Sequence, residues 1–340
     1  MTITKPQNAT LIDSISEGYT AINRRPWLVL VPIVLNIYLW FGAPLSLGPL
    51  IANITSVLRQ AQPPIAGVGD MQMMYDQFLA TGGVDLRQQF AMLNWVPTLH
   101  MYVVGSLDDG GAGVPSVPEV LRPIGAQRAD TIEIATIGGA ALAFLAINAL
   151  ALALSALFLG QVGAAVRHMD GARWSVAHGL RQAGRIGLAI LGAAGIMLGV
   201  ALALALPLLF FAGLLLYLNA TLGLLAIELL FVIAFWINIY IGFYPEAIVM
   251  SERGPLRAIY TSFNVVRRNF WGTLGFLAVS LVITLGSGVI WQRLTSTTVG
   301  LIVAIVGSAY IGSGLLAARM AFFRERLRRW ESAPAIRPSK

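Results

Sequence analysis

Six long apolar stretches lie between Trp27 and Phe323, and each is long enough to cross a lipid bilayer as a helix. A spanning helix needs about 20 mostly apolar residues, because it rises about 1.5 Å per residue through a hydrocarbon core of about 30 Å. Backbone polar groups must be hydrogen-bonded inside that core, so uninterrupted apolar runs are predicted to be helical. The predicted spans are residues 27–51, 134–162, 186–216, 222–243, 270–290 and 300–323.

Composition supports a membrane protein. The chain has 57% hydrophobic and 11% charged residues, whereas a soluble domain has about 25% charged residues. It contains no cysteine, which excludes disulfide bonds, thiolate metal sites and cysteine nucleophiles. The first 26 residues hold polar and acidic groups, so we expect the first span to be a retained helix and not a signal peptide. We predict an all-α, polytopic integral membrane protein with six transmembrane helices in three hairpins.

The basic residues indicate the orientation of the predicted spans. Most of the 23 lysines and arginines lie in residues 1–26, 163–185, 244–269 and 324–340. Arginine and lysine are enriched in cytoplasmic loops, so these four segments and both termini are predicted to be cytoplasmic. Residues 52–133 are then extracytoplasmic.

Arginines at the cytoplasmic ends of the spans are predicted to bind anionic lipid headgroups, each contributing about 1 kcal/mol near the surface. These rim arginines are Arg24, Arg25, Arg181, Arg185, Arg267, Arg268, Arg328 and Arg329. Nucleic-acid binding is the rival explanation for the net charge of +7. We disfavour it, because the arginines border apolar spans and form no continuous stripe.

Short amphipathic stretches precede the three predicted hairpins. Two of them share the pattern Tyr-Thr-x-x-Asn, at residues 19–23 and 260–264, and both end in arginine followed closely by tryptophan. A third, residues 174–185, keeps only the apolar stripe and the final arginine. We predict three interfacial helices that lie in the headgroup layer on the cytoplasmic side. Ordinary juxtamembrane linkers are the alternative.

The extracytoplasmic segment 52–133 is the one large polar insertion. It contains apolar stretches at residues 71–79 and 89–107, followed by a passage rich in glycine and proline at 109–123. Loops of this length without secondary structure are uncommon. We expect short helices on the outer surface or over the bundle. The alternative, that residues 90–107 form a re-entrant segment, stays open.

Glu228 is the one acidic residue inside a predicted span, and Asn36, Asn148 and Asn238 are the other conspicuous polar residues there. An ionisable side chain in a membrane suggests a proton, ion or substrate site. The alternative is that Glu228 reaches toward the headgroups, and that the asparagines make hydrogen bonds between helices. These four residues are the candidate intramembrane polar site.

No catalytic, metal-binding or nucleotide-binding pattern is present. His100 lies on the predicted outer side, whereas His168 and His178 lie on the cytoplasmic side, so the three cannot converge on one metal ion. We therefore expect no enzymatic activity, no metal site and no cofactor.

Residues Tyr244 to Trp271 contain an acidic turn, a short helical stretch and an Asn-Phe-Trp entry into the next apolar span. This region resembles the six-helix membrane domain fused to some bacterial glycerophosphodiester phosphodiesterases, and its stand-alone relatives. The resemblance implies a protein of the bacterial inner membrane. It carries no catalytic residues and does not imply phosphodiesterase activity.

Two functions are predicted. The first is a non-enzymatic scaffold or accessory membrane component that binds lipid, a membrane-protein partner or a second copy of itself. The alternative is a transporter or permease-like carrier whose path is lined by Glu228 and the three asparagines. A carrier predicts that Glu228 and Asn238 face an internal, water-accessible cavity. An enzyme acting on lipid would need polar groups that converge at one membrane depth, and the sequence offers none.

Overall fold

The computed structural model describes residues 10–61, 85–102, 131–167 and 176–332, and most of them are helical. The only strands in these ranges are β1 and β2, of two residues each. The all-α prediction is therefore confirmed. In chain order the elements are α1 (Leu11–Arg24), η1 (Pro26–Val29), α2 (Leu30–Phe41), β1 (Leu45–Ser46), α3 (Gly48–Ala61), α5 (Arg87–Phe90), η2 (Leu99–Met101), β2 (Ile132–Glu133), α7 (Ile137–Val166), α8 (Val176–Leu218), α9 (Ala220–Ile241), α10 (Tyr244–Ser251), α11 (Pro255–Arg268), α12 (Phe270–Leu294) and α13 (Thr298–Ser332).

Five helical segments among the described residues are long and apolar enough to cross a membrane. They match the second to sixth predicted spans. Their bounds are Ile137–Val166, Gly179–Leu218, Ala220–Ser251, Phe270–Leu294 and Thr298–Ser332.

The first predicted span, residues 27–51, is wrong in its second half. The apolar helical stretch there covers Pro26–Phe41, as η1 and α2, and it is shorter than the other five. The chain leaves the helix at Gly42-Ala43-Pro44, because proline lacks an N–H group and disfavours the helical conformation of the residue before it. Strand β1 follows and pairs in parallel with β2. The apolar run in the sequence continues past the end of the helix, so hydropathy alone does not reveal the break.

The chain forms two compact units. The first contains Met1–Arg25, Leu159–Ser280 and Gly314–Lys340, and the second contains Pro26–Phe158 and Leu281–Ser313. Helices α7, α12 and α13 each contribute one part to each unit.

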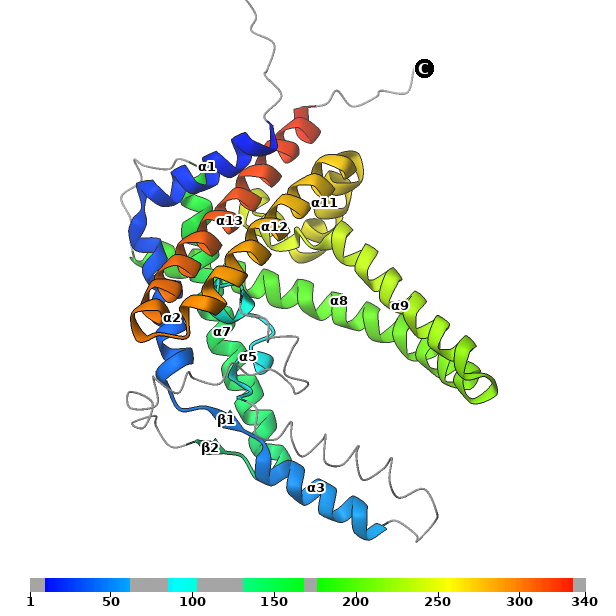
Figure 1. Cartoon of the computed structure of the whole chain (residues 1–340). Helices are drawn as coiled ribbons and strands as arrows, with labels where there is room; N and C mark the ends of the chain where they lie inside the picture. The colour runs from blue at the N-terminus through cyan, green and yellow to red at the C-terminus, as the bar shows by residue number, and fades with distance from the viewer. Residues whose placement is uncertain (1–9, 62–84, 103–130, 168–175, 333–340) are drawn as a thin grey trace, which may run out of the picture. The chain divides into compact units, whose positions relative to one another are not determined.

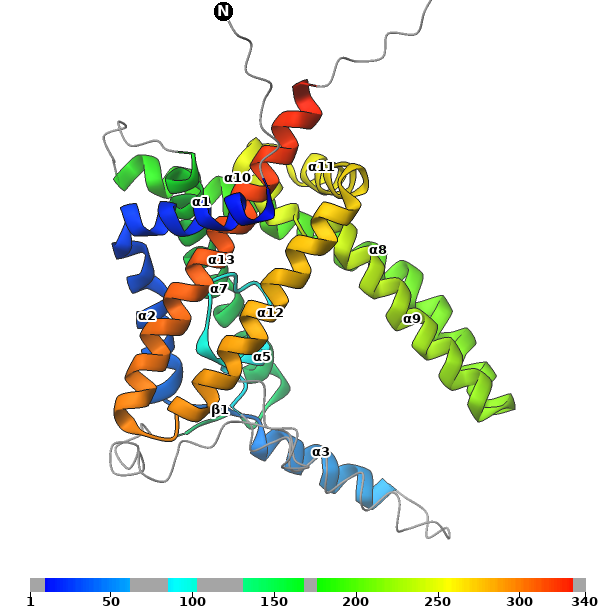
Figure 2. The same cartoon turned by 45° about the horizontal axis from the view of Figure 1, so that its top comes forward.

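In the first unit, α8 and α9 form a long hairpin whose helices lie side by side (Figures 1 and 2). Asn219 alone separates the helices, and its side chain accepts hydrogen bonds from the backbone N–H groups of Thr221 (2.9 Å) and Leu222 (3.2 Å). This side chain caps the beginning of α9. At Gly223 an added Cβ would overlap Leu216, so glycine permits the close return of the chain.

Helix α1 packs in the first unit on the part of α13 that follows Ser313. An added Cβ at Gly18 would overlap the backbone of Ala318, and one at Gly314 would overlap the ring of Tyr19. The N-terminal amphipathic stretch is thus helical, as predicted. Its small residues pack on another helix of the protein.

The other two predicted interfacial helices differ in outcome. Helix α11 is confirmed as a separate helix, and its buried face packs against α8, α9 and α10. The separate helix predicted at residues 174–185 is wrong: residues 176–185 form the first turns of α8, and residues 174–175 lie outside the described ranges. Pro26 follows α1 and Asn269 caps α11, whereas no helix-breaking proline follows Arg185.

The core of the second unit surrounds η2. Val96, Pro97, Thr98 and Leu99 are all buried, so these residues are not exposed on the surface of this unit. The re-entrant alternative for residues 90–107 stays a prediction, and residues 103–107 lie outside the described ranges. The core cluster consists of Trp40, Leu99, Trp291, Leu301, Ala304 and Ile305.

Candidate functional site

Asn36 on α2 hydrogen-bonds the backbone of η2. The residue is only 1% exposed. Its Oδ1 accepts a hydrogen bond from the N–H of Leu99 (2.6 Å), and its Nδ2 donates to the carbonyl of Pro32 (2.8 Å). Both polar atoms of this predicted site residue therefore have partners within the protein.

Asn148 on α7 binds the same segment nearer its beginning. Its Oδ1 accepts from the N–H of Leu93 (3.1 Å), and its Nδ2 donates to the carbonyls of Phe90 (2.5 Å) and Phe144 (2.9 Å). Asn148 is also buried. This predicted site residue joins α7 to the segment that follows α5.

Ser155, also on α7 and fully buried, accepts a hydrogen bond from the N–H of Trp95 (2.7 Å). Together with Asn36 and Asn148 it satisfies backbone groups that have no helical partner. An unsatisfied buried backbone group costs about 1–3 kcal/mol. These side chains therefore allow an irregular segment to lie among apolar helices.

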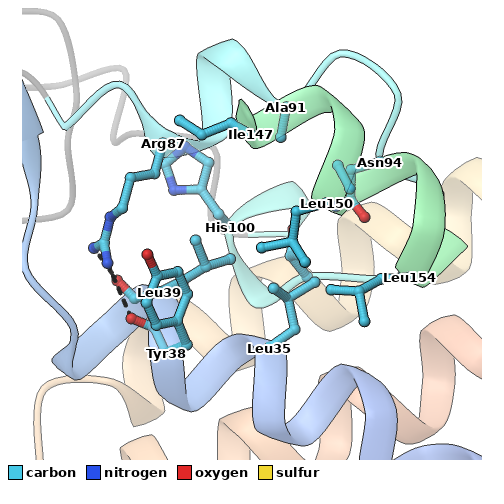
Figure 3. Close-up of a pocket in the computed structure, with 12 residues that line it drawn as sticks. Leu35, Tyr38, Leu39, Arg87, Ala91, Asn94, His100, Ile147, Leu150 and Leu154 are labelled. Atoms are coloured by element: carbon cyan, nitrogen blue, oxygen red, sulfur yellow. Dashed lines mark hydrogen bonds between the residues drawn. The ribbon is translucent and has the colours of Figure 1, made fainter. Parts of the chain in front are cut away.

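Arg87, at the start of α5, joins this segment to the end of α2. Its Nη1 donates to the carbonyl of Tyr38 (3.0 Å) and its Nη2 to that of Leu39 (2.7 Å), as the dashed lines in Figure 3 show. The last carbonyls of a helix have no partner further along the helix, so Arg87 caps the end of α2. The Tyr38 carbonyl also accepts from the N–H of Gly42 (2.8 Å). Its guanidinium also pairs with Asp85 at 2.6 Å.

Asp85 remains ionised beside Arg87. Burial alone raises the pKa of this carboxyl. Hydrogen bonds from the Arg87 side chain, from the N–H groups of Leu45 and Arg87, and the charge of Arg87 outweigh burial and hold the pKa below its usual value. The charge of Arg87 is thus balanced locally.

A pocket of about 310 Å³ lies in the second unit between α2, residues 87–100 and α7 (Figure 3). This volume is at the lower end of the range for small-molecule sites, which are mostly apolar with a few placed polar groups. Its apolar lining is Leu35, Leu39, Ala91, Ile147, Leu150, Ala151 and Leu154, and its polar lining is Tyr38, Arg87, Asn94, Thr98 and His100.

The polar residues that line the pocket differ in the hydrogen bonds that they make within the protein. Asn94 forms a local turn, in which its Oδ1 accepts from the N–H of Val96 (3.0 Å) and its Nδ2 donates to the Val96 carbonyl (3.2 Å). Thr98 and the His100 side chain make no hydrogen bond with any described residue. Burial lowers the pKa of His100, with the charge of Asp85 opposing it, so the imidazole is neutral at pH 7.

The four candidate residues of the intramembrane polar site do not come together. Asn36 and Asn148 belong to the second unit, where they bind backbone groups, whereas Glu228 and Asn238 belong to the first. Glu228 and Asn238 are both exposed on α9. None of the four lines the pocket.

Among the described residues, the most deeply buried acid is one that the sequence prediction missed. Glu246 on α10 is fully buried, and its Oε1 lies 2.7 Å from Nε of Arg319 on α13. Arg319 Nη2 also donates to the carbonyl of Gly242 (3.0 Å), and its guanidinium lies 4.9 Å from the centre of the Phe243 ring. Glu246 falls within residues 244–269, which are predicted to be a cytoplasmic connection. The apolar run that follows Tyr-Pro-Glu was the available signal for a buried position.

All eight rim arginines belong to the first unit, and six of them are exposed. Arg185 pairs with Glu252 (3.2 Å) and Arg329 pairs with Glu325 (2.9 Å). The hydrogen bond from Arg185 is the main reason that the pKa of Glu252 lies below its usual value. The exposed rim arginines are Arg24, Arg181, Arg185, Arg267, Arg268 and Arg328.

The α8–α9 hairpin is the most exposed apolar part among the described residues. Only 6% of the most apolar part of each of its two helices is buried, compared with 61% for α13. Four glycines of α8 have open space beside them, since an added Cβ would meet no atom within 4 Å. They are Gly184, Gly195, Gly199 and Gly213.

Residues 111–325 match a family described as "Domain of unknown function (DUF7847)". The match covers more than half of the chain. The chain belongs to this family. No curated protein and no solved structure matches the chain.

The family match contains the exposed hairpin and the Glu246–Arg319 pair. It does not contain Asn36 or the described residues 85–102, which line much of the pocket. The resemblance of the region Tyr244 to Trp271 to the phosphodiesterase-associated membrane domain stays a prediction, because the family description names no activity.

Proposed function

We propose that this chain is a multi-pass protein of the bacterial inner membrane that acts as a non-enzymatic scaffold or accessory component. Its α8–α9 hairpin binds a helix of another membrane protein, and its rim arginines bind anionic lipid headgroups. Both termini lie in the cytoplasm. The highly exposed apolar hairpin is the observation that carries this proposal.

Six crossings require that the short stretch Pro26–Phe41 also spans the bilayer. If straight, it is about 24 Å long, compared with about 30 Å for a typical hydrocarbon core. Local thinning of the bilayer accommodates such a difference at modest cost. With six crossings the arginine-rich segments all lie on one side of the membrane, as the positive-inside rule requires.

The glycines on α8 favour a protein partner over lipid alone. Gly184, Gly195, Gly199 and Gly213 fall within about 60° of one another around the helix, at about 100° per residue. Lipid tails provide little hydrophobic drive for helix association, so helices in membranes associate through close packing at small residues. Lipid tails can cover any apolar surface, so lipid binding alone does not require glycines on one side of the helix.

Exposed rim arginines support the lipid part of the proposal. Arg267 and Arg268 end α11, and Arg24 ends α1. Arginine near a membrane surface gains about 1 kcal/mol from anionic lipid. Binding to vesicles should therefore increase with their content of phosphatidylglycerol and decrease with added salt.

Cysteine cross-linking tests the hairpin proposal, because the chain has no native cysteine. We would introduce Gly199→Cys, or in a matched control Ala201→Cys, which is exposed about 160° away around α8. A thiol-reactive photo-cross-linker would be attached in intact membranes, and the products identified by mass spectrometry. We expect a discrete product at position 199 and a much weaker one at 201.

A second measurement uses the variant Gly195→Leu/Gly199→Leu, whose side chains would occupy the open face. We expect it to lose the partner during purification in mild detergent, whereas Ala201→Leu retains it. Equal cross-linking at positions 199 and 201, or no product at either, would refute the proposal. A disulfide between two copies of Gly199→Cys would identify the partner as a second copy of this chain.

The carrier alternative stays a prediction. Its central expectation was an internal cavity beside Glu228 and Asn238, and neither residue lines the pocket of about 310 Å³.

A further inference from the structure

We propose that the pocket between α2, residues 87–100 and α7 binds an alkyl chain that carries one neutral hydrogen-bonding group, such as a hydroxyl or an ester carbonyl. This binding site is independent of the hairpin and rim arginines on which the proposed function rests. All of its lining residues belong to the second unit.

Two helices provide the apolar walls. Leu35 and Leu39 lie one turn apart on α2, and Ile147, Leu150 and Leu154 recur at helical spacing on α7. Figure 3 shows Leu35, Leu150 and Leu154 around the same space. The volume of about 310 Å³ equals that of about ten waters in the liquid, which leaves room for about eight carbons and a small polar group.

The polar groups lie along the segment that crosses between these helices. Figure 3 places the His100 ring toward the end of the pocket where Arg87 lies, and Leu154 at the other end. A neutral imidazole offers one donor and one acceptor, and the Thr98 hydroxyl offers both. Since neither side chain has a hydrogen-bond partner among the described residues, both are available to a ligand.

The charge balance of the pocket selects a neutral ligand. The carboxylate of Asp85 pairs with Arg87, and the guanidinium already donates to two carbonyls of α2. His100 is neutral, because burial lowers its pKa. A carboxylate or an ammonium group would therefore lose its hydration without gaining an opposite charge. A hydroxyl or an ester carbonyl loses less hydration free energy, and it can form hydrogen bonds with His100 or Thr98.

Photo-labelling in vesicles tests this proposal. The full chain would be reconstituted in phosphatidylcholine, labelled with an octanol that carries a diazirine on its chain, and mapped by mass spectrometry. We expect labels on the parts of α2 and α7 that line the pocket. At equal mole fraction in the membrane and at pH 8, 1-octanol should displace the label about tenfold more effectively than octanoate or octyltrimethylammonium, equivalent to about 1.4 kcal/mol.

A matched pair of variants separates the pocket from the lipid-facing surface. Ala151→Phe places a ring in the pocket, whereas Ala153→Phe makes the same change at an exposed position of α7. We expect pocket labelling to fall at least about fivefold in the first variant, because the pocket holds only about ten water volumes. The second variant should retain it.

A phosphatidylcholine with a diazirine on its acyl chain distinguishes the two sources of such a ligand. Pocket labelling by this lipid identifies a membrane acyl ester as the occupant, whereas labelling by the octanol probe alone identifies a free amphiphile. Equal displacement by octanoate would overturn the proposal even if Ala151→Phe failed to fold. Labelling that is spread over the exposed helices and unchanged in a folded Ala151→Phe variant would also overturn it.

Discussion

Replacing Glu246 by leucine should destabilise the protein through its partner, Arg319. Glu246 is fully buried, and Arg319 is 28% exposed, with 2.7 Å between Nε and Oε1. Removing one partner of a buried ion pair costs about 3–5 kcal/mol, because the other charge remains buried without compensation. Since Arg319 retains partial access to solvent, we expect about 3 kcal/mol, at the low end of this range.

A double-mutant cycle tests this reasoning. The variants Glu246→Leu, Arg319→Met and their combination would be compared with the wild type by unfolding in mild detergent with increasing SDS. Replacing both charges of a buried pair by apolar groups is often nearly neutral. We therefore expect the double variant to lie within about 1 kcal/mol of the wild type, a recovery of about 2 kcal/mol relative to Glu246→Leu.

Glu252→Leu is the matched control. Glu252 is 50% exposed and pairs with Arg185 and Arg167 at 3.2–3.4 Å. A pair of this exposure contributes about 0–1 kcal/mol, so the control should change stability little. The reasoning is refuted if Glu246→Leu is no less stable than Glu252→Leu. It is also refuted if the double variant loses the sum of the two single losses.

Three further predictions concern interactions within one or the other of the two units. Asn148→Ala should loosen residues 90–93, at a cost of about 1–3 kcal/mol, because the N–H of Leu93 loses its partner while the Phe90 carbonyl keeps the N–H of Met92. Faster hydrogen exchange at residues 90–93 measures this. Gly18→Leu should separate α1 from α13, because even a Cβ at this position overlaps the backbone of Ala318; protease sensitivity of the N-terminal helix measures this. The stability lost in Asp85→Asn should be constant near neutral pH and should shrink below about pH 4. The folded pKa of Asp85 is lowered, so its stabilisation is complete above the unfolded pKa and is lost as pH falls through the folded one.

Each of these predictions has a contrary outcome. Unchanged exchange at residues 90–93 in Asn148→Ala would show that the segment does not depend on this side chain. A Gly18→Leu protein that resists protease as the wild type does would contradict the packing of α1. A stability deficit in Asp85→Asn that stays constant down to pH 3 would contradict the lowered pKa of Asp85.

Hydropathy predicted the later helices well, and local chemistry decided their ends. The apolar runs that begin near Ile134 and Phe270 became α7 and α12 with small shifts of their bounds. Pro44 divided the first run, whereas residues 176–185 joined α8 without a break. Hydropathy averaged over many residues does not show where one residue ends a helix, nor where a helix continues because no such residue is present.

Candidate site residues were predicted by type but not by partner. Asn36 and Asn148 are buried polar residues, as their positions in apolar runs suggest. The sequence leaves two roles open for them, a contact with substrate or hydrogen bonds between helices. The structure shows instead that they bind backbone N–H groups of residues 93 and 99. No periodicity in the sequence relates these asparagines to a segment more than 50 residues away.

The sequence by itself determined the helical class and the apolar surfaces, because both follow from local composition and from the need to pair backbone groups within a segment. Only the tertiary structure decided which polar groups are buried. Glu246 and Glu228 are both acids near apolar runs, yet Arg319 lies beside the first and the second is exposed on α9. The physical reason is that burial of a charge depends on a partner brought close by folding, and that distance is not encoded in any local window of residues.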